Sequence, residues 1–483
     1  MRRLHRGITI GAAVAALVMS ALVGSAATAQ EAPEAAAGEN APDTPRRHGP
    51  SEVTGPAASI NAMRSGKLSC GQVITKSTTL TADLGPCSGN GIIIGADNIT
   101  LNLNGHTISG TPGPGDGNAA GVRLPMRSGV LVTGQPGNSG KTGTITGFDA
   151  GVVVNGGSAN TVENLTVRDN IGPNDSTATL GDGIVLFSSA DNTIRNNTVD
   201  HNGLYDGIGV LGSGSHRNTV AANTITRSVS GTDLGTGVGV VLSGVIDEAT
   251  GDMIHGNKVV DNLIQANAGA GSSNVNVQDG LIARNTIEDN GHVMRPGNGI
   301  GLRTGVNPDS RIGHNVVQNN AIRRNGGKGI ENIFHSNENQ FLGNTIEGNG
   351  GGSDALAGIL IDPEGSGPSA GGGHLVSGNT VRQNDRFGIR LQGDPGERPD
   401  NNRIENNIVT DHPVVGIFFT YHDSGTNYIV SNYAVNNSGF ADLLDGGTLF
   451  NGVPDCDNTV WADNTYEVAL PECAANGTQV SVP

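Results

Sequence analysis

The chain has 483 residues, a net charge of −17 at neutral pH and only 3% aromatic residues. This acidity argues against nucleic acid or an anionic membrane surface as a partner. It argues less strongly against acidic polysaccharides, because a local basic site or a bound cation can overcome the net charge. An ordinary globular chain of this length would divide into several domains, whereas a repeat protein grows one unit at a time and need not divide.

Residues 1–29 have the features of an export signal. Three arginines open the segment, an apolar stretch runs over residues 8–23, and small residues at 27–29 form a cleavage site. A membrane anchor is the alternative, but the apolar stretch is short and no charged stop follows it. Residues 30–58 are rich in Ala, Pro, Glu and Gly, which is typical of a flexible leader. We therefore expect a protein that is secreted to the periplasm or the medium.

The four cysteines form two pairs with equal spacing, Cys70 with Cys87 and Cys456 with Cys473. Export permits disulfides, and four cysteines allow three pairings. We expect the two local pairings, because each would fasten one end of a repeat rod, where terminal coils leave strand edges unpaired. A zinc site is the alternative, although the long spacing and the absence of CxxC pairs disfavour it.

An internal repeat dominates the middle of the chain. Residues 183–226 contain the same phrase twice, a Gly-Ile run followed by two Asn-Thr-Ile or Asn-Thr-Val units. A marker, an apolar residue followed three positions later by Asn, then recurs at steps of about 25 to 35 residues. Its asparagines are Asn197, Asn223, Asn257, Asn285, Asn315, Asn344, Asn379, Asn407 and Asn432. The apolar runs are too short for helices and are not joined by two-residue hairpin turns.

Units that contain only short strands of one polarity predict parallel coils, because parallel neighbours need a crossover and no helix is available to provide it. Successive coils would stack about 4.8 Å apart, with Ile and Val in an inner column. Asn would occupy the sharp corners, since it tolerates a left-handed backbone, and stacked Asn side chains would form hydrogen-bonded ladders. The sequence thus predicts an all-β solenoid of about 10–12 coils with disulfide-stapled ends.

Residues 91–110 read Gly-Ile-Ile-Ile-Gly-Ala-Asp-Asn-Ile-Thr-Leu-Asn-Leu-Asn-Gly-His-Thr-Ile-Ser-Gly. With the Cys70-to-Cys87 lead-in and the later coils, this segment resembles the right-handed parallel β-helix repeat family, which has the pectin-lyase-like fold. That family includes the periplasmic copper-binding accessory proteins of nitrous oxide reductase. The resemblance covers roughly residues 68–470 and implies a single right-handed parallel β-helix. His106 in this segment is either a catalytic histidine or, as we favour, a turn histidine bonded to backbone.

The solenoid divides into three regions on this interpretation. Residues 59–110 would form the N-terminal cap and the first coils, residues 111–440 the parallel β-helix, and residues 441–483 the C-terminal cap. The repeat itself is a packing motif, so it indicates the fold and not the activity.

Enzymes with this fold have signatures that can be sought in the sequence. The Asn-Thr-Asp, Asp-Asp, Gly-His-Gly and Arg-Ile-Lys motifs of polygalacturonase-like enzymes are absent. The Asp-Pro-His-Asp motif of alginate epimerases has only a partial match, at Asp362-Pro363-Glu364. An activity, if present, therefore stays open between polysaccharide lyase, epimerase and glycoside hydrolase.

Side chains after each Gly marker alternate between inward and outward positions. The outward positions are apolar in early coils, as at Val185, Phe187 and Leu211, and become charged in later coils. We expect a charged groove there, with Asp362 and Arg390 about 5 Å apart on neighbouring coils. The candidate catalytic residues are Asp362, Glu364, Arg390 and Asp394. The candidate substrate-binding residues are Arg303, Glu331, His335, Gln392, Phe418, Tyr421, His422 and Asp423.

Two chemistries fit these candidates. Glycoside hydrolysis needs two carboxyl groups, which the acidic candidates would supply. Elimination or epimerisation of a uronate needs a base and a positive charge near the sugar carboxylate. Arg390, Arg303 or His335 would serve, with a cation such as Ca²⁺ held by Asp362 and Asp394. The aromatic candidates would stack on a sugar face. The alternatives are carbohydrate binding without chemistry and ordinary pairing of surface charges.

A copper-binding role would need clustered imidazole or thioether ligands. Met253 and His255 are two residues apart, as are His292 and Met294, and His255 and His314 occupy nearby corners. We favour the alternative that these are scattered turn residues. Two classes of function stay open: a secreted carbohydrate-active protein, and a non-catalytic surface or matrix protein. We expect a polysaccharide as the partner of a monomeric chain, and neither nucleic acid nor membrane.

Overall fold

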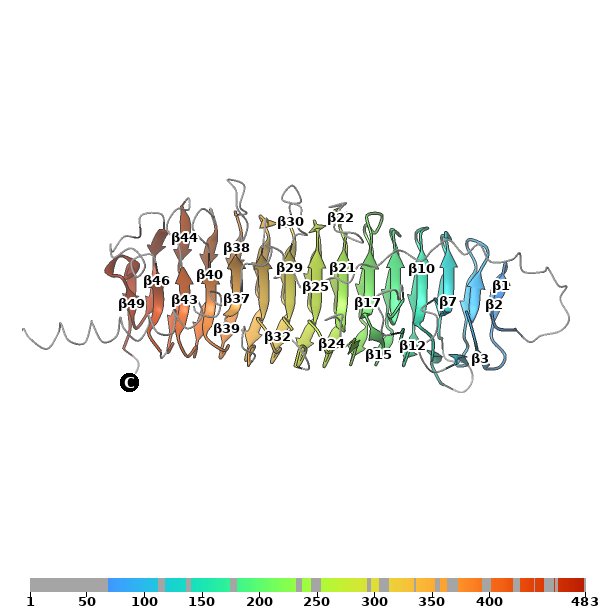
Figure 1. Ribbon diagram of the computed structural model, residues 1–483. Coiled ribbons are helices and arrows are strands. Elements are labelled where there is room, and N and C mark those ends of the chain that lie inside the picture. Colours follow the sequence, from blue (N-terminus) through green and yellow to red (C-terminus); the bar gives the residue numbers. More distant parts are fainter. Residues whose placement is uncertain are drawn as a thin grey trace, which may run out of the picture.

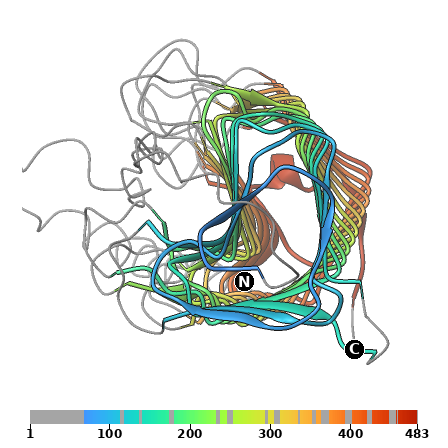
Figure 2. The same cartoon turned by 90° about the vertical axis from the view of Figure 1, so that its right-hand side faces the viewer.

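The computed structural model describes residues 68–111, 118–135, 140–173, 180–231, 237–244, 253–292, 297–303, 312–333, 336–351, 357–362, 372–392, 401–419, 426–437, 439–446, 456 and 459–481. The expected export signal and leader lie outside the described residues. The chain forms a straight rod of stacked coils (Figure 1). Viewed along its axis, three sheets surround one apolar core (Figure 2). Within the described ranges, no helix has the length and apolar character of a membrane span.

Sheet A is the first of the three long sheets and carries the candidate site on its outer face. It has 15 strands. They are β1 (Gln72–Ile74), β4 (Ile92–Ile94), β7 (Ala120–Pro125), β10 (Ala150–Asn155), β13 (Ile184–Phe187), β17 (Asp206–Leu211), β21 (Val238–Ser243), β25 (Ser272–Val275), β29 (Ile300–Arg303), β33 (Ile330–Ile333), β37 (Ala357–Asp362), β40 (Phe387–Leu391), β43 (Val415–Phe419), β46 (Ala441–Asp445) and β49 (Ala469–Leu470).

Sheet B follows sheet A around each coil and has 14 strands. They are β2 (Thr78–Thr79), β5 (Thr100–Asn102), β8 (Leu131–Thr133), β11 (Thr161–Glu163), β14 (Thr193–Arg195), β18 (Thr219–Ala221), β23 (Lys258–Val260), β27 (Leu281–Ala283), β31 (Val316–Gln318), β35 (Gln340–Leu342), β38 (Leu375–Ser377), β41 (Arg403–Glu405), β44 (Asn427–Val430) and β47 (Thr459–Ala462).

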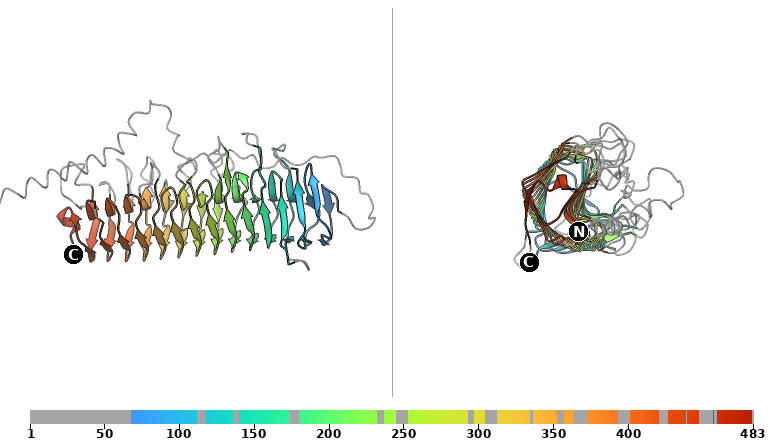
Figure 3. Two further views of the ribbon diagram at one scale, coloured as in Figure 1. Left: turned by 90° about the horizontal axis from the view of Figure 1, so that it is seen from below. Right: turned by 90° about the vertical axis from the view of Figure 1, so that its left-hand side faces the viewer.

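Sheet C completes each coil and again has 15 strands. They are β3 (Leu84–Cys87), β6 (Thr107–Gly110), β9 (Gly143–Thr146), β12 (Leu165–Arg168), β15 (Thr198–Asp200), β19 (Thr224–Thr226), β24 (Leu263–Gln265), β28 (Thr286–Glu288), β32 (Ala321–Arg323), β36 (Thr345–Glu347), β39 (Thr380–Arg382), β42 (Ile408–Thr410), β45 (Tyr433–Val435), β48 (Asn464–Tyr466) and β50 (Gly477–Gln479). Figure 3 shows the strands of successive coils in line along the rod.

Two small sheets and one short helix complete the described structure. The small sheets pair β16 (Gly203–Leu204) with β20 (Val229–Ser230), and align β22 (Ile254–His255), β26 (Val277–Gln278), β30 (Ile312–Gly313) and β34 (Ser336–Asn337). The helix is the 3₁₀ turn η1 (Glu472–Ala474). All pairings join strands of successive coils in parallel, as the sequence predicted for coils without hairpins. The right-handed parallel β-helix is confirmed.

The apolar core consists of inward columns in strict register. In sheet A, Ile184 of β13 lies beside Ile208 of β17, which lies beside Val240 of β21. All three side chains are fully buried. β-Branched residues suit such columns, because their branched side chains pack well on a pleated surface.

Three ladders of buried asparagines run along the corners of the rod. Ladder 1 precedes sheet B, ladder 2 lies between sheets B and C, and ladder 3 follows sheet C. In ladder 1, the backbone N–H and the side-chain Nδ2 of Asn192 both donate to Oδ1 of Asn218, at 2.9 Å each. The Nδ2 of Asn218 also donates to the carbonyl oxygen of Ser189 at 2.8 Å. Each amide therefore satisfies backbone groups that the corner would otherwise bury unpaired. The predicted ladders are confirmed.

The left-handed backbone position, however, is not the ladder asparagine but the residue before it. In ladder 2, Ala222 and Arg284 have φ values of 54° and 55°, directly before Asn223 and Asn285. The prediction that asparagine takes the left-handed conformation holds at Asn196, Asn319 and Asn406, which precede ladder residues, but not for the ladder members themselves. A left-handed non-glycine residue costs about 1 kcal/mol, and the ladder hydrogen bonds on the next residue offset that cost.

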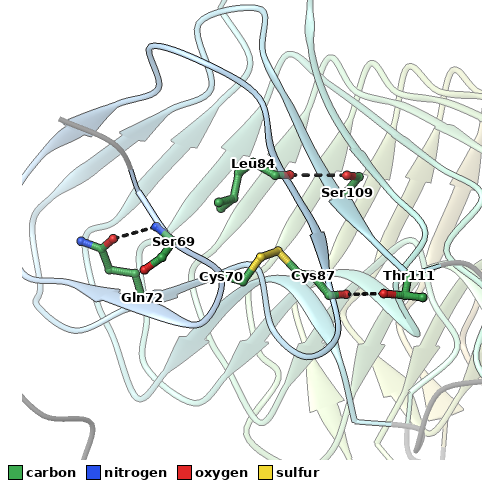
Figure 4. The surroundings of a disulfide bond; sticks show 7 residues. All are labelled: Ser69, Cys70, Gln72, Leu84, Cys87, Ser109 and Thr111. Atoms are coloured by element: carbon green, nitrogen blue, oxygen red, sulfur yellow. Dashed lines mark hydrogen bonds between the residues drawn. A yellow bond between two sulfur atoms is a disulfide. The ribbon is translucent and has the colours of Figure 1, made fainter.

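Disulfides join Cys70 to Cys87 and Cys456 to Cys473, with Cα–Cα distances of 5.4 Å and 6.1 Å, so the local pairing is confirmed. Figure 4 shows the first bridge beside the next coil, where the Thr111 hydroxyl donates to the Cys87 carbonyl oxygen at 3.1 Å. The strands of the two expected caps continue sheets A, B and C. The bridges thus close the first and last coils of one rod.

The rod has more coils than expected, since sheets A and C contain 15 strands each against a prediction of about 10–12 coils. The reason is the marker used for counting. It begins only at Asn197, whereas coils already form over residues 72–168. These first coils pack the same apolar columns but carry fewer corner asparagines, so the sequence repeat is weaker there than the structural repeat.

Candidate functional site

The outer face of sheet A has a charged band between two buried apolar clusters. The first cluster contains Val185, Phe187 and Leu211, and the second contains Leu360, Phe387, Phe418 and other apolar side chains. These outward residues are separate from the inner core but are still buried. The sequence predicted their outward direction correctly but not their burial. The charged band, formed by Ser273, Asn298, Arg303, Lys328 and Glu331, comes from strands β25 to β33 and the turns before them.

Hydrogen bonds link the members of the charged band across coils. Lys328 Nζ lies 2.6 Å from Glu331 Oε1, and Asn298 Nδ2 donates to Glu331 Oε2 at 2.7 Å. An Arg303 guanidinium nitrogen donates to Ser273 Oγ at 3.2 Å. Glu331 is therefore held by two donors, so it is oriented as a hydrogen-bond acceptor and an electrostatic partner.

Arg303 is the most perturbed charge of the band. Burial lowers the pKa of its guanidinium to about 10, and the nearby Glu331 carboxylate opposes that shift. Desolvation disfavours the charged form, so a further negative group beside Arg303 would stabilise its charge.

Arg390 lies over two adjacent aromatic rings. Its guanidinium carbon is 5.3 Å from the ring centroid of Phe387 and 5.6 Å from that of Phe418, and the two rings are 5.3 Å apart. Cation–π contacts at these distances fix the guanidinium over the second apolar cluster. Phe418 is fully buried, so it supports Arg390 and does not offer a free face for stacking on a sugar.

The register of β37 and β40 differs from the expected juxtaposition of Asp362 and Arg390. Arg390 lies beside Leu360, and Asp362 is two residues further along its strand. On one face this is a diagonal pair at about 7–8 Å and not a direct pair at about 5 Å. The neighbour of Asp362 on the previous coil is Ile333, and Asp362 is only 3% exposed. Gln392 follows β40, and its N–H donates to the Ile361 carbonyl oxygen at 2.9 Å.

The remaining candidates lie outside the described residues. They are Glu364, Asp394, His335, Tyr421, His422 and Asp423. Their assignment as catalytic or substrate-binding residues stays a prediction.

A polar pocket on the corner between sheets A and B was not predicted from the sequence. Its volume is ≈ 540 Å³, and it is lined by His314, Asn337, Glu338, Gln340, Gly372, Gly373, Leu375 and Asn401. His314 Nε2 lies 3.2 Å from Glu338 Oε2, and His314 Nδ1 lies 3.6 Å from Asp279 Oδ1. These residues come from four different coils, so no short sequence motif contains them together. The only sequence signal was the corner position shared by His255 and His314.

Of the histidines considered for copper, His255 and His314 both approach Asp279, as their nearby corner positions predicted, whereas His292 does not. His255 Nδ1 lies 3.8 Å from Asp279 Oδ2, whereas His292 Nε2 contacts the Arg324 carbonyl oxygen at 2.6 Å on another corner. Among the described residues, no group of three or more His, Cys, Asp or Glu side chains is arranged to hold a metal ion. The donor set present there does not fit a copper site.

The His106 side chain contacts Asp83 Oδ1 at 3.3 Å, which is a side-chain partner and not the backbone group that we expected.

Two histidines are buried in the ladders. His374 occupies a rung of ladder 1 and His412 a rung of ladder 3, where other coils have asparagine. Burial lowers the pKa of each imidazole to about 4. Their contacts are to ladder and backbone groups, so they serve the fold and not a site.

Comparison with known families agrees with the architecture. A model of the right handed beta helix region matches residues 70–247, and a model of the periplasmic copper-binding protein NosD matches residues 275–449. Both matches agree with the right-handed parallel β-helix that the strand pairing shows. No curated protein matches this β-helix protein significantly.

Solved structures share the fold of this β-helix protein at low identity. The A-module of the mannuronan C-5 epimerase AlgE6 from Azotobacter vinelandii has a TM-score of 0.53 at 17% identity, covering 74% of this chain and 88% of that module. PfbA, a surface adhesin of Streptococcus pneumoniae, has a TM-score of 0.48 at 12% identity, covering 73% of this chain and 83% of that one. At 17% identity, the likeness to the epimerase module shows the fold alone.

Proposed function

We propose that this protein is exported and binds an acidic polysaccharide on the outer face of sheet A, across the charged band and Arg390. The observation that carries the proposal is the set of cations held on one face of a protein with a net charge of −17. Arg303 and Lys328 lie on adjacent coils of this face, and Arg390 lies two coils further along, beyond β37. Successive coils are about 4.8 Å apart, so the cations follow the axis of a linear polymer.

Each cation is suited to a carboxylate-bearing sugar. Arg303 is poorly solvated, which favours an added negative charge. Arg390 is fixed by two rings, so it loses little conformational freedom when it binds. Glu331 is oriented by Lys328 and Asn298 and supplies an acceptor for sugar hydroxyls.

Binding is supported better than cleavage by the described residues. A hydrolase needs two carboxyl groups flanking the scissile bond, and a uronate lyase needs a base at the sugar carbon. Asp362, the described acid among the catalytic candidates, is buried and lies diagonal to Arg390. The catalytic roles of Asp362 and Arg390 stay predictions, and the binding test below includes a product assay that would detect them.

Support from relatives is limited to ligand class. The mannuronan C-5 epimerase module acts, by its name, on a uronate polymer, so we would test polyuronates first. Two disulfides are typical of proteins outside the cytoplasm, where such polymers are found.

The test is affinity electrophoresis and calorimetry of the full chain with polyuronates and neutral glucans, with and without calcium. We expect polyuronate binding that weakens with salt and falls at least tenfold in Arg303→Ala and in Arg390→Ala. The matched control is Arg284→Ala, which removes an equal charge between sheets B and C, where Arg284 pairs with Asp261. Ultraviolet absorbance and reducing ends would report chain cleavage. Folded variants that bind polyuronate as the wild type does would overturn the proposal.

A further inference from the structure

We infer that the outer face of sheet B carries a second binding track, for a neutral β-1,4-linked glycan, beginning in the polar pocket at His314 and Glu338. This track lies on a different face from the charged band and does not depend on the proposed function. The observation behind it is that the pocket and the exposed aromatic Tyr428 share one column of sheet B.

The column is continuous over five strands. Its residues lie side by side in successive coils: Gln340, Leu375, Arg403, Tyr428 and Val460. Gln340 and Leu375 also line the pocket. The strand spacing of about 4.8 Å is close to the rise per residue of an extended β-1,4-linked sugar chain, so successive sugars would meet successive side chains.

The column changes character along the rod, which gives the track its direction. Its earlier members are Thr161, Thr193, Thr219 and Lys258, followed by the half-buried Leu281 and Val316, and none of them is aromatic. The later members include Tyr428, which is 37% exposed, and Val460, which is 41% exposed. A tyrosine ring presented on a flat sheet offers its apolar face to a sugar ring. The Arg403 guanidinium lies 5.8 Å from the Tyr428 ring centroid and supports the ring from the neighbouring coil.

The pocket supplies the hydrogen bonds that an aromatic face lacks. Imidazole, carboxylate and amide groups from His314, Glu338, Gln340 and Asn401 meet there, and each can bond a sugar hydroxyl. Its volume of ≈ 540 Å³ falls in the ordinary range for small-molecule sites, about 300–1,000 Å³. One sugar unit in the pocket and others over Leu375 and Tyr428 would extend along the rod axis.

The charge of the track selects a neutral ligand. Glu338 is an exposed carboxylate in the pocket, and Asp279 lies next to it beyond His314. Arg403 is already paired with Glu405. A polyuronate would therefore meet repulsion in the pocket without a free arginine to balance it, whereas a neutral glycan would meet donors and acceptors only.

The test uses cellohexaose and chitohexaose in titration calorimetry with the full chain. We expect wild-type binding, and at least a tenfold weaker affinity in Tyr428→Ala and in Gln340→Ala. The control Tyr433→Ala makes the same change on neighbouring sheet C, where Tyr433 is 44% exposed, and should bind like the wild type. Arg303→Ala should also retain the neutral hexamers, which separates this track from the charged band.

Two outcomes would overturn the inference. One is that titration of the folded wild-type protein with either hexamer releases or absorbs no heat of binding. The other is unchanged affinity in Tyr428→Ala, or equal losses in Tyr428→Ala and Tyr433→Ala. Because Tyr428 and Gln340 are exposed, both variants should fold, and circular dichroism would check this.

Discussion

The buried histidines of the ladders predict that the rod loses stability as the pH falls from about 6.5 towards 4. His374 accepts a hydrogen bond from the Asn339 N–H at Nδ1, at 3.1 Å, and His412 is packed between carbonyl groups of the previous coils. Burial lowers the pKa of both imidazoles to about 4. The native state therefore keeps these rings neutral at pH values where the unfolded chain binds a proton.

The sign follows from proton linkage. Below a pH of about 6.5 the unfolded state takes up protons that the native state does not, so the free energy of unfolding falls with pH. The loss ends near pH 4, where the native rings also become protonated. Each histidine contributes a loss of about 2 kcal/mol at pH 5, approaching about 3 kcal/mol below pH 4. At His412, hydrogen bonds to the carbonyl groups of Val381 and Asn384 oppose part of the lowering of the pKa, and the charge of Asp411 opposes it further.

The perturbation is replacement of each histidine by the asparagine that other rungs carry, as His374→Asn and His412→Asn. The free energy of unfolding would be measured by urea titration at pH 7 and pH 5. We expect each variant to lose about 2 kcal/mol less than the wild type between these pH values, and the double variant about 4 kcal/mol less. Asn432→Ala, which removes a ladder side chain that does not titrate, is the control. It should lower the free energy of unfolding by the same amount at pH 7 and at pH 5.

The reasoning fails if the single variants show the same pH dependence as the wild type. An equal pH dependence of the free energy of unfolding would mean that the imidazole rings are hydrated in the native state and titrate there as they do in the unfolded state. Because a long repeat rod need not unfold in one step, hydrogen exchange of the coils around each histidine gives a local measure of the same quantity.

Three further predictions concern the rod. The double variant Cys70→Ser, Cys87→Ser should lower the free energy of unfolding by about 3 kcal/mol, because the bridge closes a loop of 17 residues. Faster amide hydrogen exchange in the first coils should reveal this loss. Unchanged exchange rates there would contradict the role of the bridge in fastening the end of the rod. Phe418→Ala should cost about 3–5 kcal/mol in urea unfolding, since Phe418 is fully buried, whereas the exposed Tyr433→Ala should cost under about 1 kcal/mol; similar costs would refute the burial argument. Asn432→Ala should cost about 1–3 kcal/mol by leaving the Asn407 N–H without its acceptor, and a neutral substitution would show that the ladder contributes nothing.

The repeating part of the fold could be predicted from the sequence because each coil is encoded within one short stretch of the chain. Within one coil, the short Ile and Val runs indicate the strands and the inner apolar column, and the Asn and Gly residues that follow them indicate the corners. The cysteine spacing likewise indicated the two bridges. The left-handed corner position was predicted only in part. Asparagine holds it at Asn196, Asn319 and Asn406, whereas Ala222 and Arg284 have no preference for it, and there the ladder hydrogen bonds of the next residue impose it.

The sites depend on which residues of different coils become neighbours, and insertions between the markers make that register unreadable from spacing alone. Asp362 and Arg390 thus lie on a diagonal, while Glu338, Leu375 and Tyr428, far apart in the chain, belong to one surface. The sequence repeat by itself determined a rod of parallel coils with closed ends, because each coil repeats the same packing problem, and the family resemblance implied its right-handed sense. Only the tertiary structure decided where charge and aromatic surface gather, because strand pairing between coils sets those distances.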